Sequence, residues 1–225
     1  MHEAAPSFAH DLPPDWRARL RSRLLVQPDH RLEHCQLGSS IAAGTAQTLT
    51  ELLEGLAGTL QAAAVLIPII ERPAAPMLLL TVRASHLSRH AGQISFPGGR
   101  LEARDADVAA AALRETEEET GIHAAFVEPI GFLPDHIVVT GYRITPVVAL
   151  VRPGFVLRPD STEVADVFEL PLAVALVSAN YRVQRRLMRG READSWELSF
   201  GEYRIWGATA RMLRTLSELV GEGDA

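Results

Sequence analysis

The most constraining feature of this chain is residues 98–122, in which a glycine pair precedes an alanine-rich run that ends in clustered acids. Residues 108–114 are good helix formers, and Gly121 is a typical residue to end the helix. Its last two turns carry Glu115, Glu117, Glu118 and Glu119. The helix dipole and repulsion between acids one turn apart both disfavour this placement. A bound cation would remove the penalty, and oxygen ligands suit Mg²⁺ or Mn²⁺.

The helical period divides these side chains into faces. The spacing predicts a buried stripe of Ala109, Leu113, Thr116 and Thr120. On a neighbouring face it gathers Glu115, Glu118 and Glu119, and it turns Glu117 toward solvent. Arg114 lies one turn before Glu118 and can hold that carboxylate by a charge-assisted hydrogen bond. The alternative is a solvated acidic surface without a ligand.

The segment resembles the Nudix box, which places Gly, Glu, Arg-Glu, Glu-Glu and Gly at fixed spacings. The match is close from Arg114 to Ile122, although Thr116 stands at a position that is usually apolar. Asp105 stands where Glu is expected, and eight residues rather than seven separate it from Arg114. Either Asp105 or Asp107 can cap the helix.

The resemblance implies a metal-dependent hydrolase in which Glu115 and Glu119 bind Mg²⁺ or Mn²⁺. Glu118, oriented by Arg114, is expected to be a third ligand or the general base that activates water. Glu163 is a weaker candidate from a distant loop, and for it a plain surface acid is the favoured interpretation.

Residues 79–99 resemble the signature of the coenzyme A pyrophosphatases, a subfamily of the Nudix hydrolases. Ser88 departs from an expected arginine, and Arg89 follows it directly. Further similar segments are Pro134-Asp135, Thr140 to Tyr142, Thr145 to Val148, Glu163-Val164, Phe168 to Leu172, Ile205 to Gly207 and Thr209-Ala210. The resemblance implies that the substrate is coenzyme A (CoA), or an acyl or oxidised derivative, cut to 3′,5′-ADP and 4′-phosphopantetheine.

The residues of this segment also have a direct physical interpretation. Arg83 ends an apolar strand where it can reach a phosphate, and Arg89 and His90 supply donors from the next loop. Gly98 and Gly99 permit backbone conformations that bring amides close to a ligand. The alternatives are a surface arginine, an ordinary loop histidine and a simple turn. His136, Tyr142 and Trp206 could line an apolar pocket for pantetheine, or lie in the core or on the surface.

Three other functions stay open. A Nudix hydrolase of another nucleotide, such as ADP-ribose or a dinucleoside polyphosphate, would keep the box without needing the 79–99 signature. An isoprenyl diphosphate isomerase would use another set of residues. A non-catalytic ligand-binding module would not need the complete Arg-Glu and Glu-Glu pairs.

Composition narrows the class of protein. With 225 residues, 47% of them hydrophobic, the chain can bury the core of a globular domain. Its net charge of −6 argues against nucleic acid as a partner. Its single cysteine, Cys35, suits a reducing cytoplasm, and no signal peptide or membrane-length apolar run is visible. We expect a small nucleotide as partner, no membrane contact and, as a hypothesis, a homodimer.

The pattern of elements indicates one mixed sheet between helices, of the α/β (α+β) class. Helices are expected at 15–26, 48–57 and 207–220. The acidic segment forms a further helix, and a short one is expected after Pro171. Strands are expected at 62–70, 77–83, 126–133, 143–151 and 164–169, with a hairpin of 181–188 and 195–205. The Nudix resemblance implies an α/β/α sandwich, with residues 1–60 as a partly loose helical extension and 61–221 as the Nudix hydrolase domain.

Overall fold

The computed structural model describes residues 12–37, 40–41, 60–86, 92–138, 140–188 and 191–220. In this part of the chain the helices are α1 (Trp16–Arg23), α3 (Val108–Thr120), α4 (Leu172–Leu176) and α5 (Ala208–Val220). The strands of the larger sheet are β1 (Gln36–Leu37), β3 (Gln61–Ile70), β4 (Met77–Arg83), β5 (Ile94–Ser95), β6 (Gly98–Arg100), β7 (Val127–Phe132), β8 (His136–Val138), β9 (Tyr142–Val151) and β10 (Val164–Pro171). The smaller sheet contains β2 (Ser40–Ile41), β11 (Tyr181–Met188), β12 (Arg191–Phe200) and β13 (Tyr203–Trp206).

The centre of the larger sheet is the parallel pair β3 and β9, which stay in register over their whole length. Both strands are almost entirely apolar, as expected for strands that are covered on both faces. The face toward α3 carries Ala64, Leu66, Val147 and Ala149. The opposite face carries Ile67, Ile69, Val148 and Leu150, which pack with α1 and α5. Antiparallel neighbours complete the sheet, so the predicted mixed sheet between helices is confirmed.

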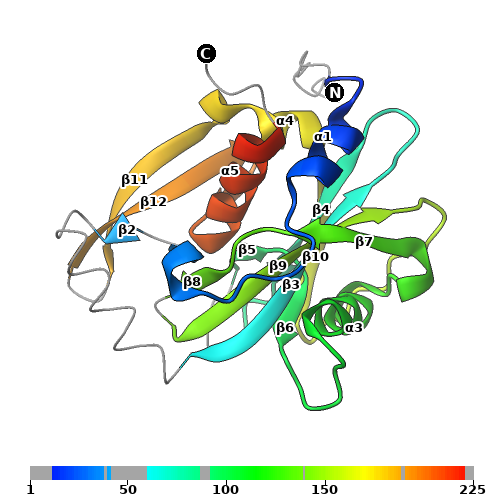
Figure 1. Cartoon of the computed structure of the whole chain (residues 1–225), viewed down its shortest axis with the longest axis horizontal. Coiled ribbons are helices and arrows are strands. Elements are labelled where there is room, and N and C mark those ends of the chain that lie inside the picture. Colours follow the sequence, from blue (N-terminus) through cyan, green and yellow to red (C-terminus); the bar gives the residue numbers. More distant parts are fainter. Residues whose placement is uncertain are drawn as a thin grey trace.

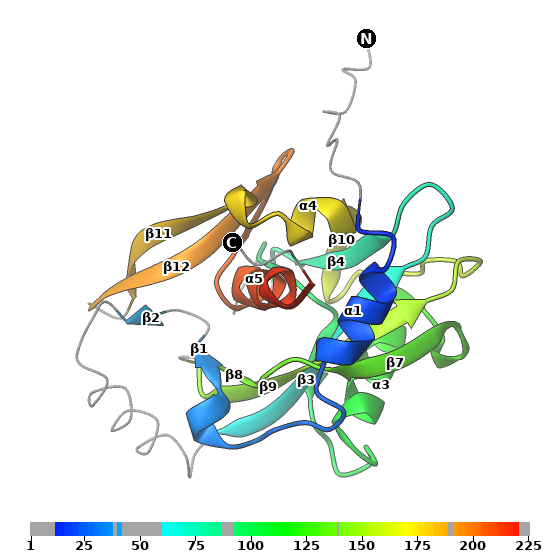
Figure 2. The same ribbon diagram turned by 45° about the horizontal axis from the view of Figure 1, so that its top comes forward.

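The elements form the layers of an α/β/α sandwich, as expected. Helix α3 covers one face of the larger sheet, and α1 and α5 cover the other (Figure 1). In the turned view, α5 lies between this sheet and the long hairpin of β11 and β12 (Figure 2). The C-terminal helix therefore joins the two sheets into one body.

Two expected elements differ from the structure. The predicted strand 195–205 is two strands, β12 and β13, because Gly201 adopts a left-handed conformation (φ +56°) and reverses the chain. Helix α1 is shorter than predicted and ends at Arg23, although the expected apolar face of Trp16, Leu20 and Leu24 is buried. The predicted helix 48–57 lies outside the described residues.

Both ends of α3 have the expected caps. The Asp107 side chain accepts a hydrogen bond from the Ala110 amide at 2.8 Å, so Asp107 rather than Asp105 is the N-cap. At the other end, Gly121 is left-handed (φ +77°) and its amide donates to the Glu117 carbonyl at 2.9 Å. Beyond Gly121, the amides of Arg158 and Asp160 donate to the last carbonyls of the helix, which ties loop 152–163 to its C-terminal end.

The buried face of α3 corrects part of the prediction. Thr116 and Thr120 are buried as expected, but Ala109 and Leu113 are only half-buried. Ala111 and Ala112 take the central position instead, because their small side chains let the helix lie close to β3. The turn of the helix by about one residue brings Glu119 into the buried face and leaves Glu117 exposed.

Candidate active site

Strand β6 places the glycine pair directly against the acidic side chains of α3. A β-carbon on Gly99 would lie 2.4 Å from the carboxylate of Glu115. A β-carbon on Gly98 would lie 2.3 Å from the Ala64 carbonyl, and the Gly98 amide donates to Glu119 Oε2 at 3.3 Å. Both positions need glycine because the backbone and the carboxylates approach closely. The glycine pair therefore lies against Glu115 and Glu119, while its expected contact with a substrate stays a prediction.

Arg114 organises the other side of this cluster. Its guanidinium forms two hydrogen bonds with Asp105, at 2.9 and 3.0 Å, and one with Glu115 at 2.9 Å. It also donates to Glu118 at 3.0 Å and to the Arg100 carbonyl at 3.1 Å. The hydrogen bonds with Asp105 raise the pKa of Arg114 well above its usual range, and Arg114 in turn lowers the pKa of Asp105 to about 2. Asp105, despite its shifted spacing, is thus the buried partner of Arg114.

We expect Asp105→Asn to remove a pH-dependent part of the stability. The pKa of Asp105 is lowered to about 2, below the value of about 4 that an aspartate has in the unfolded chain. Its contribution to the free energy of unfolding is therefore complete above about pH 4 and is lost as the pH falls toward 2. Urea unfolding of the two proteins should therefore show a difference in unfolding free energy at pH 7 that narrows below pH 4. A difference that stays constant down to pH 3 would show that charge is not its cause.

Burial disfavours the ionised forms of Glu115 and Glu119, although each has an arginine nearby. Glu119 is 4% exposed, and burial raises its pKa to about 8, with smaller upward contributions from Glu163 and Glu115. Arg83 and the Gly98 amide act in the opposite direction. Burial also raises the pKa of Glu115, although Arg114 opposes that shift. Two neighbouring carboxylates that resist ionisation for these reasons are suited to a bound cation.

Glu118 does not join that pair. Its side chain is 51% exposed, and its two oxygens are held by Arg104 at 3.3 Å and Arg114 at 3.0 Å. Within the described ranges, no three acidic, histidine or cysteine side chains converge to form a metal site. Of the three expected metal ligands, Glu118 is thus the one held by arginines, and Glu115 and Glu119 are the two that lie at the glycine pair; their role as ligands stays a prediction. The pair fits Mg²⁺, which proteins commonly bind through one or two carboxylates while water and substrate phosphates complete its coordination.

Arg83 lies close enough to Glu119 to lower the pKa of that carboxyl. It ends β4, and its backbone amide donates to the Gln93 carbonyl at 2.9 Å. Its Nε is buried and has no hydrogen-bond partner in the described part of the chain. A buried donor without a partner is costly, so a ligand that accepts this hydrogen bond would be favoured. The other predicted basic residues of this region, Arg89 and His90, lie outside the described residues.

Glu163 lies closer to Glu115 and Glu119 than its distance in sequence suggested. Its side chain is exposed, as the favoured interpretation had it, but it lies close enough to raise the pKa of both Glu115 and Glu119. The antiparallel pairing of β10 with β4 sets Val164 opposite Arg83 and brings Glu163 to the site. No local sequence pattern marks such a position, because the contact depends on strand pairing across 80 residues.

The three residues considered for a pantetheine pocket have different environments. His136 is fully buried, its Nδ1–H donates to the Pro134 carbonyl at 2.9 Å, and burial lowers its pKa to about 4. Tyr142 and Trp206 are half-buried. The hydroxyl of Tyr142 accepts a hydrogen bond from Arg100 at 2.8 Å. His136 is therefore a core residue, and Tyr142 lies nearest to the glycine pair through its contact with Arg100.

Comparison with known proteins places these features in context. Residues 60–190 match the family model described as the NUDIX domain. A protein of Escherichia coli O1:K1, named uncharacterized Nudix hydrolase NudL, is 48% identical over 159 residues, which cover 71% of this chain and 82% of the relative. The protein of the same name from Shigella boydii serotype 18 has the same identity and coverage.

Solved structures give a more distant likeness. The Nudix hydrolase RenU of M. smegmatis has a TM-score of 0.43 and 21% identity, with 50% of this chain and 71% of that chain covered. The NUDIX domain of Shewanella oneidensis NrtR, complexed with ADP ribose, has a TM-score of 0.41 and 19% identity, with coverage of 52% and 76%. In the described part of this chain, no helix is long and apolar enough to cross a membrane.

Proposed function

Because this chain belongs to the Nudix hydrolase family, whose enzymes act on nucleoside diphosphate derivatives, we propose that it hydrolyses the diphosphate bond of CoA or a CoA derivative. The products are 3′,5′-ADP and 4′-phosphopantetheine. The observation that carries the proposal is the position of Arg83. The Nε–H of this residue is buried near Glu119 and has no partner among the residues that the structure describes, so a substrate phosphate would satisfy it.

Other described residues of the 79–99 segment hold the backbone around Arg83 in place. Thr81 and Phe96 are 1% and 2% exposed and hold β4 and the turn before the glycine pair in the core. The Thr81 hydroxyl donates to the Ser95 carbonyl at 3.3 Å, which links the two parts of the segment. The described parts of the segment, residues 79–86 and 92–99, are thus joined by the pairing of β4 with β5 and carry Arg83 and Gly98.

Nudix hydrolases use divalent metal ions, and we assign Mg²⁺ or Mn²⁺ to this chain. Glu115 and Glu119 would hold it. Such an ion neutralises the charge of the diphosphate and lowers the pKa of a bound water. Arg114 positions Glu115 through the hydrogen bond at 2.9 Å, and Arg83 binds the phosphate that faces Glu119.

Glu118 and Glu163 are the two candidates for the general base that accepts a proton from the attacking water. Glu118 was expected in this role, but Arg104 and Arg114 already occupy its two oxygens. Glu163 has an exposed side chain close to both Glu115 and Glu119, which favours it as general base. The backbone of Glu163 is held to β4 by the Ala84 amide at 2.8 Å, so this carboxylate is carried on an anchored residue.

A panel of substrates tests the proposal. The protein is incubated with CoA, ADP-ribose and 8-oxo-dGTP in the presence of Mg²⁺, Mn²⁺ or a chelator, and the products are identified by mass. We expect 3′,5′-ADP from CoA when metal is present and no product with the chelator. A preference for ADP-ribose would keep the metal assignment and overturn the substrate. Binding without turnover of any of the three would indicate a ligand-binding module. The cytoplasmic location and the homodimer stay predictions.

A further inference from the structure

One arginine beside the glycine pair lacks the acidic partner that its neighbours have. Arg104 forms ion pairs with Glu102 at 2.8 Å and Glu118 at 3.3 Å, and Arg114 is paired with three carboxylates. Arg100 forms no ion pair with any described residue, and its side chain hydrogen-bonds only to the Tyr142 hydroxyl among them. In a chain of net charge −6, an unneutralised cation beside the candidate active site points to an anionic ligand.

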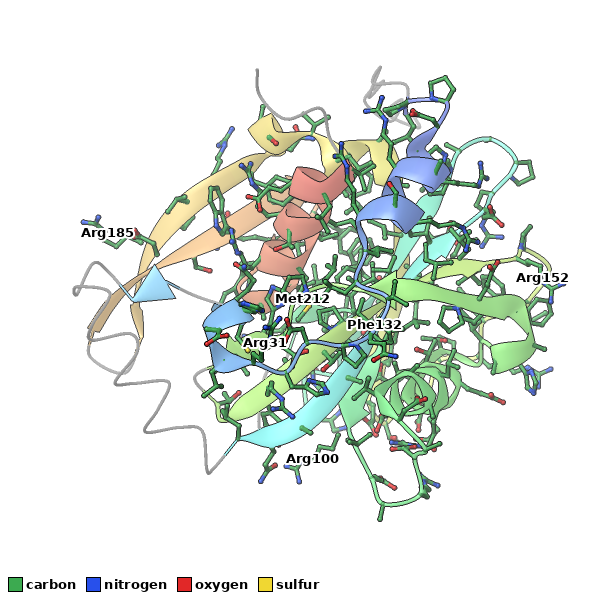
Figure 3. All side chains as sticks on the ribbon, in the orientation of Figure 1. Arg31, Arg100, Phe132, Arg152, Arg185 and Met212 are labelled. Carbon is green, nitrogen blue, oxygen red and sulfur yellow. The ribbon has the colours of Figure 1, made fainter. Side chains whose placement is uncertain are left out.

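The side chain of Arg100 is nevertheless held in place. Its Nε donates to the Tyr142 hydroxyl at 2.8 Å, and its guanidinium carbon lies 5.4 Å from the centre of the Tyr142 ring. Its carbonyl accepts the hydrogen bond from Arg114, which fixes the backbone to the box arginine. Figure 3 places Arg100 at the lower edge of the molecule, beyond the packed side chains. With Nε engaged, both Nη groups can face a ligand.

The direction of Arg100 separates its role from that of Arg83. Gly99 faces Glu115, and successive residues of a strand point to opposite faces of the sheet, so Arg100 points to the other face. Tyr142 reaches it from the start of β9, across β3. Arg100 directly follows Gly99 in β6, so an anion at Arg100 would lie next to the glycine pair, on the other side of this strand from Glu115, and would be a separate group from the diphosphate.

We propose that Arg100 and Tyr142 bind a second phosphate of the substrate, one carried on the ribose. This inference rests on the proposed function, since CoA carries such a phosphate and ADP-ribose does not. The guanidinium edge matches two phosphate oxygens, and the Tyr142 hydroxyl, which accepts from Arg100, still has its own proton to donate. The pair thereby selects nucleoside diphosphates that are phosphorylated on the ribose.

The test compares CoA with dephospho-CoA, which has the same diphosphate but no ribose phosphate. The wild type should show a KM for CoA that is roughly tenfold to a hundredfold lower, the effect of charge-assisted hydrogen bonds. Arg100→Gln should raise the KM for CoA to that of dephospho-CoA, with kcat nearly unchanged, and Tyr142→Phe should raise it less. Arg152→Gln is the control, because Arg152 is exposed and lies at the right edge of the view in Figure 3, away from Arg100 at the lower edge.

Two results would overturn the inference. One is a wild type that does not discriminate between the two substrates, and the other is an Arg100 variant that loses both activities equally. Calorimetry with 3′,5′-ADP and 5′-AMP separates this inference from the proposed function. Tighter binding of 3′,5′-ADP that disappears in Arg100→Gln supports the pair even if CoA is not cleaved. Equal affinities in the wild type reject the pair even if CoA is the substrate.

Discussion

Glu119→Gln should lower kcat by about three orders of magnitude or more and leave the protein folded. Loss of a carboxylate that holds the metal removes several kcal/mol of transition-state stabilisation, and each 1.4 kcal/mol is about tenfold in rate. The glutamine has the same shape and keeps an oxygen for the Gly98 amide, which lies 3.3 Å from Glu119 Oε2. Turnover of CoA with saturating Mg²⁺ or Mn²⁺ measures the effect.

This substitution should not lower the stability of the folded protein. Glu119 is 4% exposed and its pKa is raised to about 8, so the protein gains nothing from the charge without a bound cation. Thermal unfolding without metal should show an equal or higher midpoint for the variant. Added Mg²⁺ should raise the midpoint of the wild type and have less effect on that of Glu119→Gln.

Glu117→Gln is the matched control for this experiment. It removes the same charge from the same turn of α3, but Glu117 is exposed and faces away from the glycine pair. We expect its kcat, KM and metal response to equal those of the wild type. Equal loss in both variants would mean that the charge of the helix, rather than the position of Glu119, supports activity. Full turnover in Glu119→Gln would refute its assignment as a metal ligand.

Arg114→Met should lower the unfolding free energy by about 3–5 kcal/mol, the usual effect of removing one partner from a buried ion pair. Asp105, whose side chain is 3% exposed, would lose both of its hydrogen bonds to the guanidinium and stay buried as a charge. Glu115 would lose its hydrogen bond to Arg114, so kcat should fall as well. Urea unfolding and CoA turnover measure the two effects.

A second substitution separates these two roles of Arg114. Asp105→Asn in the Arg114→Met background removes the unpaired charge, so we expect part of the stability to return. Activity should not return, because Glu115 and Glu118 still lack the guanidinium that holds them. Arg114→Lys should resemble Arg114→Met in activity, since an ammonium group cannot bind several carboxylates in a fixed planar geometry. An Arg114→Met protein as stable as the wild type would contradict the buried role of Asp105.

The local sequence was sufficient to predict the acidic helix and its ends. Its caps at Asp107 and Gly121, the exposure of Glu117 and the contact between Arg114 and Glu118 all follow from interactions within a few residues. The apolar strands β3, β4 and β9 were also readable, because strands that are covered on both faces are apolar at nearly every position. For the same reason the mixed sheet between helices could be predicted.

The arrangement of charges could not be predicted in the same way. The spacing predicted the contact of Arg114 with Glu118, but not that Arg104 also holds Glu118 or that Glu119 is buried beside the glycine pair. The difference comes from the rotation of α3 on the sheet, which depends on how closely Ala111 and Ala112 pack against β3. A predicted stripe that is wrong by one residue changes which carboxylate is buried.

What this sequence determined by itself is a capped acidic helix next to a glycine pair, and with it the family, because those features act over a few residues. Tertiary structure alone decided which groups meet there. Glu163 reaches Glu119 through the pairing of β10 with β4, and Tyr142 reaches Arg100 across β3. Such contacts join residues more than 40 positions apart, and their geometry is set by strand register and helix packing.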